Sequence, residues 1–241
     1  MIKATDLAYG RLGAPDLDRM EEFLVDFGMV RADRTKKALY MRGTDGDHHH
    51  IHVTELGEPT HIGLAWWVSS EEDLKIISKA PGASEIHEID EPGGGKRVNL
   101  MDPDGRIIEV IHGMKTVDDL DVRDVAINTG NDKYKRTEIQ RLSMNPGQPS
   151  QVKRSAHAVV KTADLNKFNE WYQSTLGLIM TDSIMDFEDE TKDMMTFNHI
   201  DAGDNYVDHH VLLAIQSDHA EFNHLSFEAA DFDDVQTGHY W

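Results

Sequence analysis

Residues 9–28 read YGRLGAPDLDRMEEFLVDFG, and residues 157–177 read HAVVKTADLNKFNEWYQSTLG. Each stretch has a short strand-like run, then an aspartate, then apolar residues at helical spacing, and ends in glycine. The aspartates, Asp16 and Asp164, can cap a helix by accepting hydrogen bonds from its first backbone N–H groups. The closing glycines fit the left-handed conformation that ends many helices. Two copies of one strand–helix unit predict a chain built from repeats.

Two further segments begin in the same way. Residues 61–77 read HIGLAWWVSSEEDLKII, and residues 224–235 read HLSFEAADFDDV. Residues 86–112 have the pattern of strands, interrupted by the turn signal DPDG. We therefore predict an α+β fold of paired βαβββ modules, three of them complete and a fourth only begun. Their expected ranges are 5–56, 59–113, 154–217 and 222 onward.

The modules predict two domains. Residues 1–114 would form an N-terminal domain of two modules, and residues 154–241 a C-terminal metal-binding domain whose fourth module is incomplete. Residues 115–153 are polar, contain NPGQP, and are expected to connect the two domains. A complete fourth module should need about as many residues as the second, so we expect the chain to be truncated at its C-terminal end.

Composition excludes several classes of function. The formal net charge is −20, from 24 basic and 44 acidic side chains, which disfavours nucleic acid and anionic membranes as partners. The chain has no cysteine, so disulfides, thiolate nucleophiles and iron–sulfur clusters are excluded. No stretch has the length and apolarity of a membrane helix, and the N-terminus lacks the apolar core of a signal peptide. These features favour a cytoplasmic protein in which any metal is bound by histidine, carboxylate or water.

Histidines near strand-like segments are the candidate ligands. His157 and His224 each lie near the start of such a segment in the second half of the chain, at matching places in the repeat. His209 and His210 lie just before the apolar run VLLA. A single histidine in a strand is usually structural, but two at repeated positions favour a shared metal site.

With these repeats and histidines, the whole chain resembles a type I extradiol ring-cleavage dioxygenase of the vicinal oxygen chelate superfamily. The resemblance implies Fe(II), or occasionally Mn(II), bound by two histidines and a carboxylate, with His157 and His224 as the histidine ligands. It also implies a catalytic acid–base histidine in the last strand of the third module, about 15 residues before the second ligand. His210 lies 14 residues before His224 (224 − 210), and His209 is the adjacent alternative. The implied substrates are a catechol-type aromatic diol and O₂, and the implied assembly is a homo-oligomer.

The resemblance also implies a glutamate ligand within a Pro-x-Gly-x-x-x-Glu pattern late in the fourth module. The one copy of this pattern spans residues 103–109 in the second module, and Glu228 and Asp231 come too early to replace it. We therefore expect the third ligand to lie beyond Trp241 and iron binding by this chain to be impaired.

Two alternatives remain open from the sequence. Residues 47–52 read DHHHIH, and an exposed strand edge is the simplest interpretation. They could instead complete an N-terminal metal site with His61 and Glu109, as in glyoxalase- or epimerase-like enzymes. There Tyr9 replaces the expected first-strand histidine, so His50 or His52 would have to supply a ligand. The other alternative is a non-catalytic small-molecule-binding protein of the same fold. His199 could line the C-terminal cavity.

Overall fold

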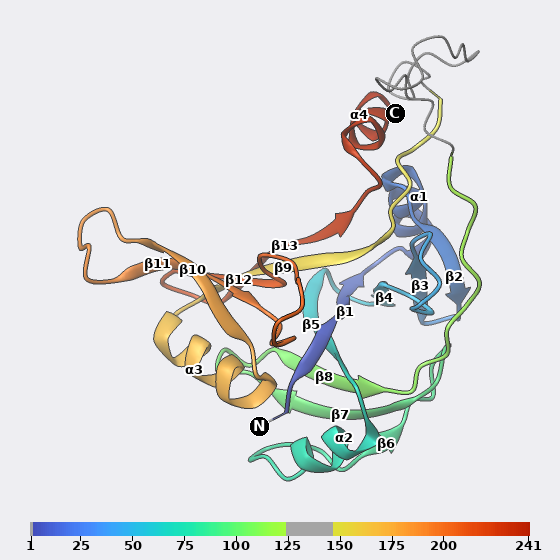
Figure 1. Ribbon diagram of the computed structural model, residues 1–241. Helices are drawn as coiled ribbons and strands as arrows, with labels where there is room; N and C mark the ends of the chain where they lie inside the picture. Colours follow the sequence, from blue (N-terminus) through green and yellow to red (C-terminus); the bar gives the residue numbers. More distant parts are fainter. Residues whose placement is uncertain (1, 124–146) are drawn as a thin grey trace.

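The computed structural model describes residues 2–123 and 147–241 (Figure 1). Its helices are α1 (Leu17–Phe27), α2 (Glu71–Ile77), α3 (Leu165–Leu176) and α4 (Phe232–Tyr240). Its strands are β1 (Ala4–Ala14), β2 (Val30–Arg34), β3 (Ala38–Arg42), β4 (His52–Leu56), β5 (Thr60–Val68), β6 (His87–Glu88), β7 (Lys96–Met101), β8 (Ile107–His112), β9 (Arg154–Thr162), β10 (Ile179–Met185), β11 (Asp193–His199), β12 (Leu212–Gln216) and β13 (Glu221–Glu228). Within these residues, no helix is long and apolar enough to cross a membrane.

Strand pairing follows one plan in both halves of the chain. The first eight strands form a sheet in the order β2-β3-β4-β1-β5-β8-β7-β6, and the other five form a sheet in the order β10-β11-β12-β9-β13. The first and last strands of each strand–helix–three-strand unit pair in parallel, as β1 with β4, β5 with β8 and β9 with β12. The first strands of neighbouring units pair antiparallel, as β1 with β5 and β9 with β13. This arrangement confirms the predicted α+β class.

The helices begin and end where the sequence predicts. Asp16 accepts hydrogen bonds from the N–H groups of residues 18 and 19, and Asp164 accepts one from residue 167. Gly28 has φ 112° and Gly177 has φ 73°, in the left-handed region that side chains with a Cβ avoid. A Cβ at Gly177 would also lie 2.5 Å from the carbonyl oxygen of Ile2. The end of α3 is thus packed closely against the start of the chain.

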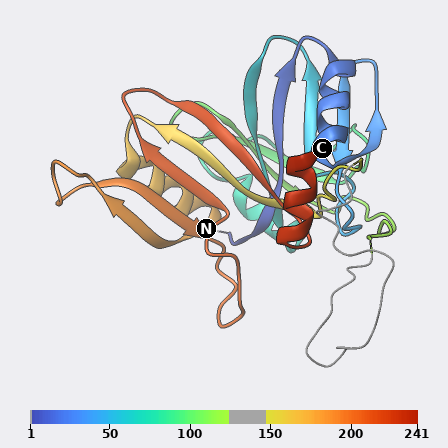
Figure 2. The same ribbon diagram turned by 90° about the horizontal axis from the view of Figure 1, so that it is seen from above.

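One apolar core is shared by the two halves. Leu7 and Trp66, from the eight-stranded sheet, belong to the same buried cluster as Phe168 and Tyr172 of α3. The rings of Trp66 and Tyr172 lie 6.4 Å apart in an edge-on arrangement. Figure 2 shows the two sheets side by side, with α4 close to α1. An indole hydrogen bond of 3.2 Å from Trp241 Nε1 to Asp26 Oδ1 joins the ends of those two helices.

A buried ionic network at the turn between β7 and β8 also joins the halves. The carboxylate of Asp102 accepts hydrogen bonds from Tyr172 Oη at 3.0 Å and from Arg106 Nη1 at 2.8 Å. Its side chain is fully buried, and its other oxygen accepts the backbone N–H groups of residues 104 and 106. The Arg106 guanidinium also donates to the backbone carbonyl of Lys161 on β9. The predicted turn is confirmed, and it is a contact point between the halves as well.

Candidate metal centre

His157 and His224 lie on neighbouring strands with their imidazoles facing each other. In the antiparallel pairing of β9 with β13, Val159 is opposite His224 and His157 is opposite Ser226. The two Nε2 atoms are 3.4 Å apart. Histidine nitrogens lie about 2.0–2.1 Å from a zinc-sized ion, and two of them on one ion are then about 3.0–3.4 Å apart at octahedral to tetrahedral angles. The observed separation fits two ligands of a single ion.

The hydrogen bond made by His224 leaves its Nε2 free to act as a ligand. His224 Nδ1 lies 2.7 Å from Oδ1 of Asn223. Because an amide oxygen only accepts hydrogen bonds, Nδ1 carries the proton and Nε2 keeps its lone pair. A partner at the far ring nitrogen is the usual way in which a ligating histidine is oriented.

His210 completes the cluster from the loop before β12. Its ring centroid lies 4.4 Å from that of His157 and 5.1 Å from that of Phe197, which packs edge-on against it. The adjacent His209 packs against Phe197 at 5.6 Å, and its Nδ1 is 3.1 Å from His210 Nδ1. The structure thus brings His157, His210 and His224 together, as the sequence predicts.

An arginine fixes the loop that carries His210. Arg154, three residues before His157 on β9, forms ion pairs with Asp208 at 2.7 Å, Glu228 at 2.6 Å and Asp6 at 3.5 Å. Asp208 immediately precedes the histidine pair, so this contact holds the loop against the strand that carries His157. Thr181 adds a second tether, because its hydroxyl donates to the carbonyl of His209 at 2.6 Å. The sequence interpretation did not include these anchors.

Burial favours the neutral form of His157 and His210. The pKa of His157 is lowered to about 4, first by burial and then by repulsion from the imidazoles of His210 and His224. The pKa of His210 is lowered by burial and by the neighbouring His209. Neutral imidazoles can bind a metal ion or accept a proton at neutral pH, which protonated imidazoles cannot.

The described residues supply no third ligand of the expected kind. Across residues 2–123 and 147–241, no group of three His, Cys, Asp or Glu side chains is arranged to hold a metal ion. Glu228 forms ion pairs with Lys153 and Arg154, and Asp231 caps α4. The described residues therefore supply the two histidines of a two-histidine, one-carboxylate site but not its carboxylate.

The residues of the N-terminal alternative are arranged differently. Glu109 pairs with Ala65 across β5 and β8, so His61 lies four residues away along the strand, or about 13 Å at ~3.3 Å per residue. His61 instead stacks on Phe222, with ring centroids 4.4 Å apart and planes 8° apart. Glu109 is engaged by Tyr9 and two arginines. The structure does not bring His61 and Glu109 to one site.

Residues 47–52 are not the exposed strand edge that the sequence suggests. His50 is 0% exposed and His52 is 2% exposed. His52 lines a hollow with apolar residues of β1 and α1. The ring of His50 lies 4.8 Å from that of Tyr9 and 5.1 Å from that of Tyr40. Alternation of exposed and buried residues could not reveal this, because the burial comes from side chains distant in the sequence, such as Tyr9.

This burial predicts a pH-dependent stability that depends on His52. Burial lowers the pKa of His52 to about 4, so the native state favours the neutral imidazole. The stabilisation is complete above the unfolded-state pKa and is lost as the pH falls from about 6.5 to 4, a loss of about 3 kcal/mol. His52→Leu and His52→Gln should both reduce the pH dependence of the free energy of unfolding, measured by urea denaturation. Equal pH dependence in the parent and both variants would contradict this assignment.

Comparisons with known proteins agree with this architecture. No protein-family model matches the chain. The chain is 26% identical over 229 residues to metapyrocatechase 2 of Cupriavidus necator, covering 94% of this chain and 66% of the relative. The Mn(II)-bound glyoxalase from Novosphingobium aromaticivorans superimposes with a TM-score of 0.77 at 18% identity, covering 100% of this chain and 71% of that one. Homoprotocatechuate 2,3-dioxygenase from Arthrobacter globiformis gives a TM-score of 0.71 at 17% identity, covering 98% and 68%.

The fold is therefore that of the vicinal oxygen chelate proteins. In sequence, the chain is similar to metapyrocatechase 2. The chain spans about two-thirds of the length of the curated relative that it matches, 66%.

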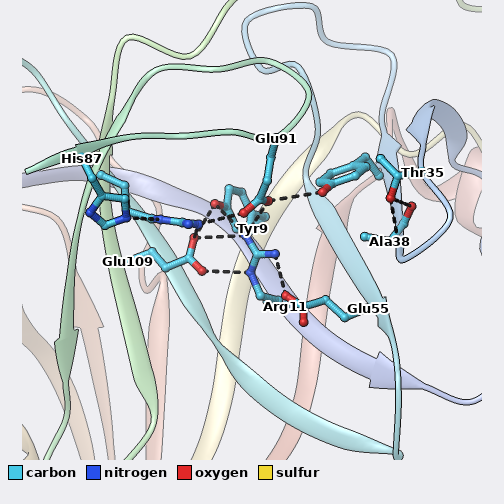
Figure 3. Close-up of polar contacts among 10 residues, drawn as sticks. Tyr9, Arg11, Thr35, Ala38, Glu55, His87, Glu91 and Glu109 are labelled. Atoms are coloured by element: carbon cyan, nitrogen blue, oxygen red, sulfur yellow. Dashed lines mark hydrogen bonds and ion pairs between the residues drawn. The ribbon is translucent and has the colours of Figure 1, made fainter.

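The structure also contains an ionic cluster that the sequence interpretation missed (Figure 3). On the concave side of the eight-stranded sheet, Arg11 contacts Glu55, Glu91 and Glu109, each at 2.9 Å. Tyr9 Oη donates to Glu109 Oε2 at 2.6 Å. The sequence contains one sign of this cluster. Arg11 stands in β1 at a position where the strand pattern predicts an apolar, inward-facing residue.

Proposed function

We propose that this protein cleaves the ring of a catechol-type diol with O₂ at a mononuclear Fe(II) site, with Mn(II) as an alternative ion. His157 and His224 are the protein's two imidazole ligands, and His210 is the acid–base residue. The observation that carries the proposal is the 3.4 Å separation of the two Nε2 atoms, with the His210 ring packed 4.4 Å from His157. The sequence relationship to metapyrocatechase 2 supports the choice of reaction.

The donor set fits such an ion. An ion held on one face by two imidazoles and a carboxylate would offer open positions to two catechol oxygens and O₂ and would lower the pKa of the catechol hydroxyls. Nitrogen and carboxylate ligands suit iron and manganese. The third ligand of this proposal is a carboxylate that none of the described residues supplies.

The side chains around the ligands would handle protons and orientation. His210, neutral because burial and His209 lower its pKa, can accept a proton from a catechol hydroxyl and return it later. Phe197 packs edge-on against His210 and restricts rotation of its ring. Asn223 accepts a hydrogen bond from His224 Nδ1, which leaves the lone pair on His224 Nε2, the atom that faces His157. Arg154 and Asp208 hold the loop in place.

Metal binding and turnover can be measured in one series. Protein loaded anaerobically with Fe(II) should take up O₂ on addition of catechols and form a yellow ring-fission product, followed by absorbance and an oxygen electrode. His157→Ala and His224→Ala should each lose bound iron by about 10-fold or more. His61→Ala is the matched control and should retain iron.

Two results would argue against the proposal. Retained iron in His157→Ala together with loss in His61→Ala would move the site to the N-terminal half. Binding of iron and catechol without O₂ uptake would favour a non-catalytic binding protein of the same fold.

A further inference from the structure

The two halves of the molecule share one strand register, which allows residue positions to be compared. Tyr9 and His157 each lie seven residues before the aspartate that caps the next helix (16 − 9 and 164 − 157). In the first half Gly10 pairs with His52, and in the second half Ala158 pairs with Leu212. Counting back two residues from His52 and Leu212 makes His50 the counterpart of His210.

The same comparison finds the counterpart of His224. Arg11 pairs with Gly63 in the first half, and Val159 pairs with His224 in the second. Gly63 and His224 also each lie seven residues before their helix caps (70 − 63 and 231 − 224). The counterpart of His224 is therefore Gly63, not His61. A Cβ at Gly63 would lie 2.0 Å from the carbonyl oxygen of Ile107, so no ligating side chain fits there.

The other counterpart positions converge in the N-terminal half. Tyr9, at the position of His157, donates to Glu109 at 2.6 Å, and its ring lies 4.8 Å from that of His50. Glu109 pairs with Ala65, the counterpart of Ser226, so it brings a carboxylate beside the positions of His157 and His224. In this half neither counterpart of the two assigned imidazole ligands is a histidine, while a carboxylate is present.

A guanidinium group lies among these side chains. The side chain of Arg11 is 5% exposed and binds three carboxylates at 2.9 Å each. With Arg97, which contacts Glu91 at 3.0 Å and Glu109 at 3.1 Å, the cluster holds two positive and three negative groups, a net charge of −1 (2 − 3). Removing the Arg11 guanidinium would leave the three carboxylates with only Arg97 to balance them.

A buried imidazole with an unpartnered nitrogen packs against the same cluster. His50 is fully buried, and its Nε2 has no hydrogen-bond partner among the described residues. Its ring packs against Tyr9, whose hydroxyl touches both Glu109 and Arg11. A buried unpaired imidazole nitrogen is costly, and a cation beside it can use its lone pair.

We propose that the concave side of the N-terminal sheet is a second cation site in which the guanidinium of Arg11 occupies the position of a metal ion. When that guanidinium is removed, a hard divalent cation such as Mn(II) should bind to Glu109 and Glu91, with Tyr9 and His50 alongside. Oxygen-rich donor sets of this kind favour Mn(II). The position of this site is inferred by comparison with the proposed C-terminal site, but its test does not require His157 and His224 to bind a metal.

The test compares Mn(II) binding in variants that all carry His157→Ala, so that the C-terminal pair does not contribute. Arg11→Ala should bind one Mn(II) per chain about 100-fold more tightly than the parent, measured by loss of the free-Mn(II) electron paramagnetic resonance signal. Arg97→Ala and Arg11→Lys keep a cation at the Arg11 position and should bind no more tightly than the parent. Adding Glu109→Gln to Arg11→Ala should abolish the gain.

Thermal unfolding provides a second readout if Arg11→Ala folds poorly. Mn(II), or guanidinium ion at millimolar concentration, should raise the melting temperature of Arg11→Ala and leave that of Arg11→Lys unchanged. Failure of both cations to bind or stabilise Arg11→Ala, including failure of the variant to fold in their presence, would overturn the proposal. So would tight Mn(II) binding by Arg97→Ala with Arg11 intact.

Discussion

Replacing His210 with asparagine is expected to lower kcat for catechol cleavage by about 100- to 10,000-fold, the usual contribution of a positioned acid–base group. Asparagine can still pack against Phe197 but cannot exchange a proton near neutral pH. Because the imidazoles assigned as ligands are His157 and His224, the bound iron should be unchanged. Steady-state oxygen uptake and iron analysis of the same preparations measure both quantities.

The neighbouring residue provides the matched control. His209 lies next to His210 and packs against the same Phe197 ring, but its described ring contacts are with Phe197 and His210, not with His157. His209→Asn should therefore reduce kcat far less than His210→Asn. A larger loss in His209→Asn would assign the proton-transfer role to His209. Loss of iron in His210→Asn would make His210 a ligand.

Asp102→Ala is expected to lower the free energy of unfolding by about 3–5 kcal/mol, because it removes the fully buried carboxylate that pairs with Arg106 and also accepts hydrogen bonds from Tyr172 and the turn. The side chains of Asp102 and Arg106 are 0% and 6% exposed, so water cannot replace the lost contacts. Tyr172 would lose its hydrogen-bond partner at the same time. Chemical denaturation followed by circular dichroism measures the loss.

Asp104 distinguishes the network from a general charge effect. Its carboxylate also contacts Arg106, at 2.8 Å, but it has no hydrogen bond to Tyr172 and does not accept the backbone N–H groups of the turn. Asp104→Ala should lower the free energy of unfolding by about 1 kcal/mol, because it removes one ion pair while Arg106 keeps its contact with Asp102. Equal losses in the two variants would show that Asp102 has no special role in joining the halves.

Local signals made most of the fold predictable. Asp16, Asp164 and Asp231 each accept backbone hydrogen bonds where the sequence places a helix start. These signals depend on residues within one turn of each other, so neighbouring residues alone determine them. The repeat then makes the strand order predictable as well, because equivalent strands of each unit pair in equivalent ways.

The candidate site was predictable only where the repeat is informative. His157 and His224 stand at repeated positions, so the repeat links them although they are 67 residues apart. The partnership of Arg11 with Glu109 spans 98 residues and follows no local pattern. His61 was considered for an N-terminal metal site, but the residue at the register of His224 is Gly63, and only the strand pairing shows that His61 lies far from Glu109.

The shared core has a consequence for the order in which the chain folds. The buried face of Leu7 and Trp66 is covered by α3, whose residues follow more than 50 positions after the last strand of the eight-stranded sheet. During synthesis that sheet can form before α3 is available, and it then exposes an apolar surface. Contacts between residues this distant in sequence also slow folding. We therefore expect the risk of aggregation, and the need for chaperones, to be greatest after the N-terminal sheet has been synthesised and before α3 can cover it.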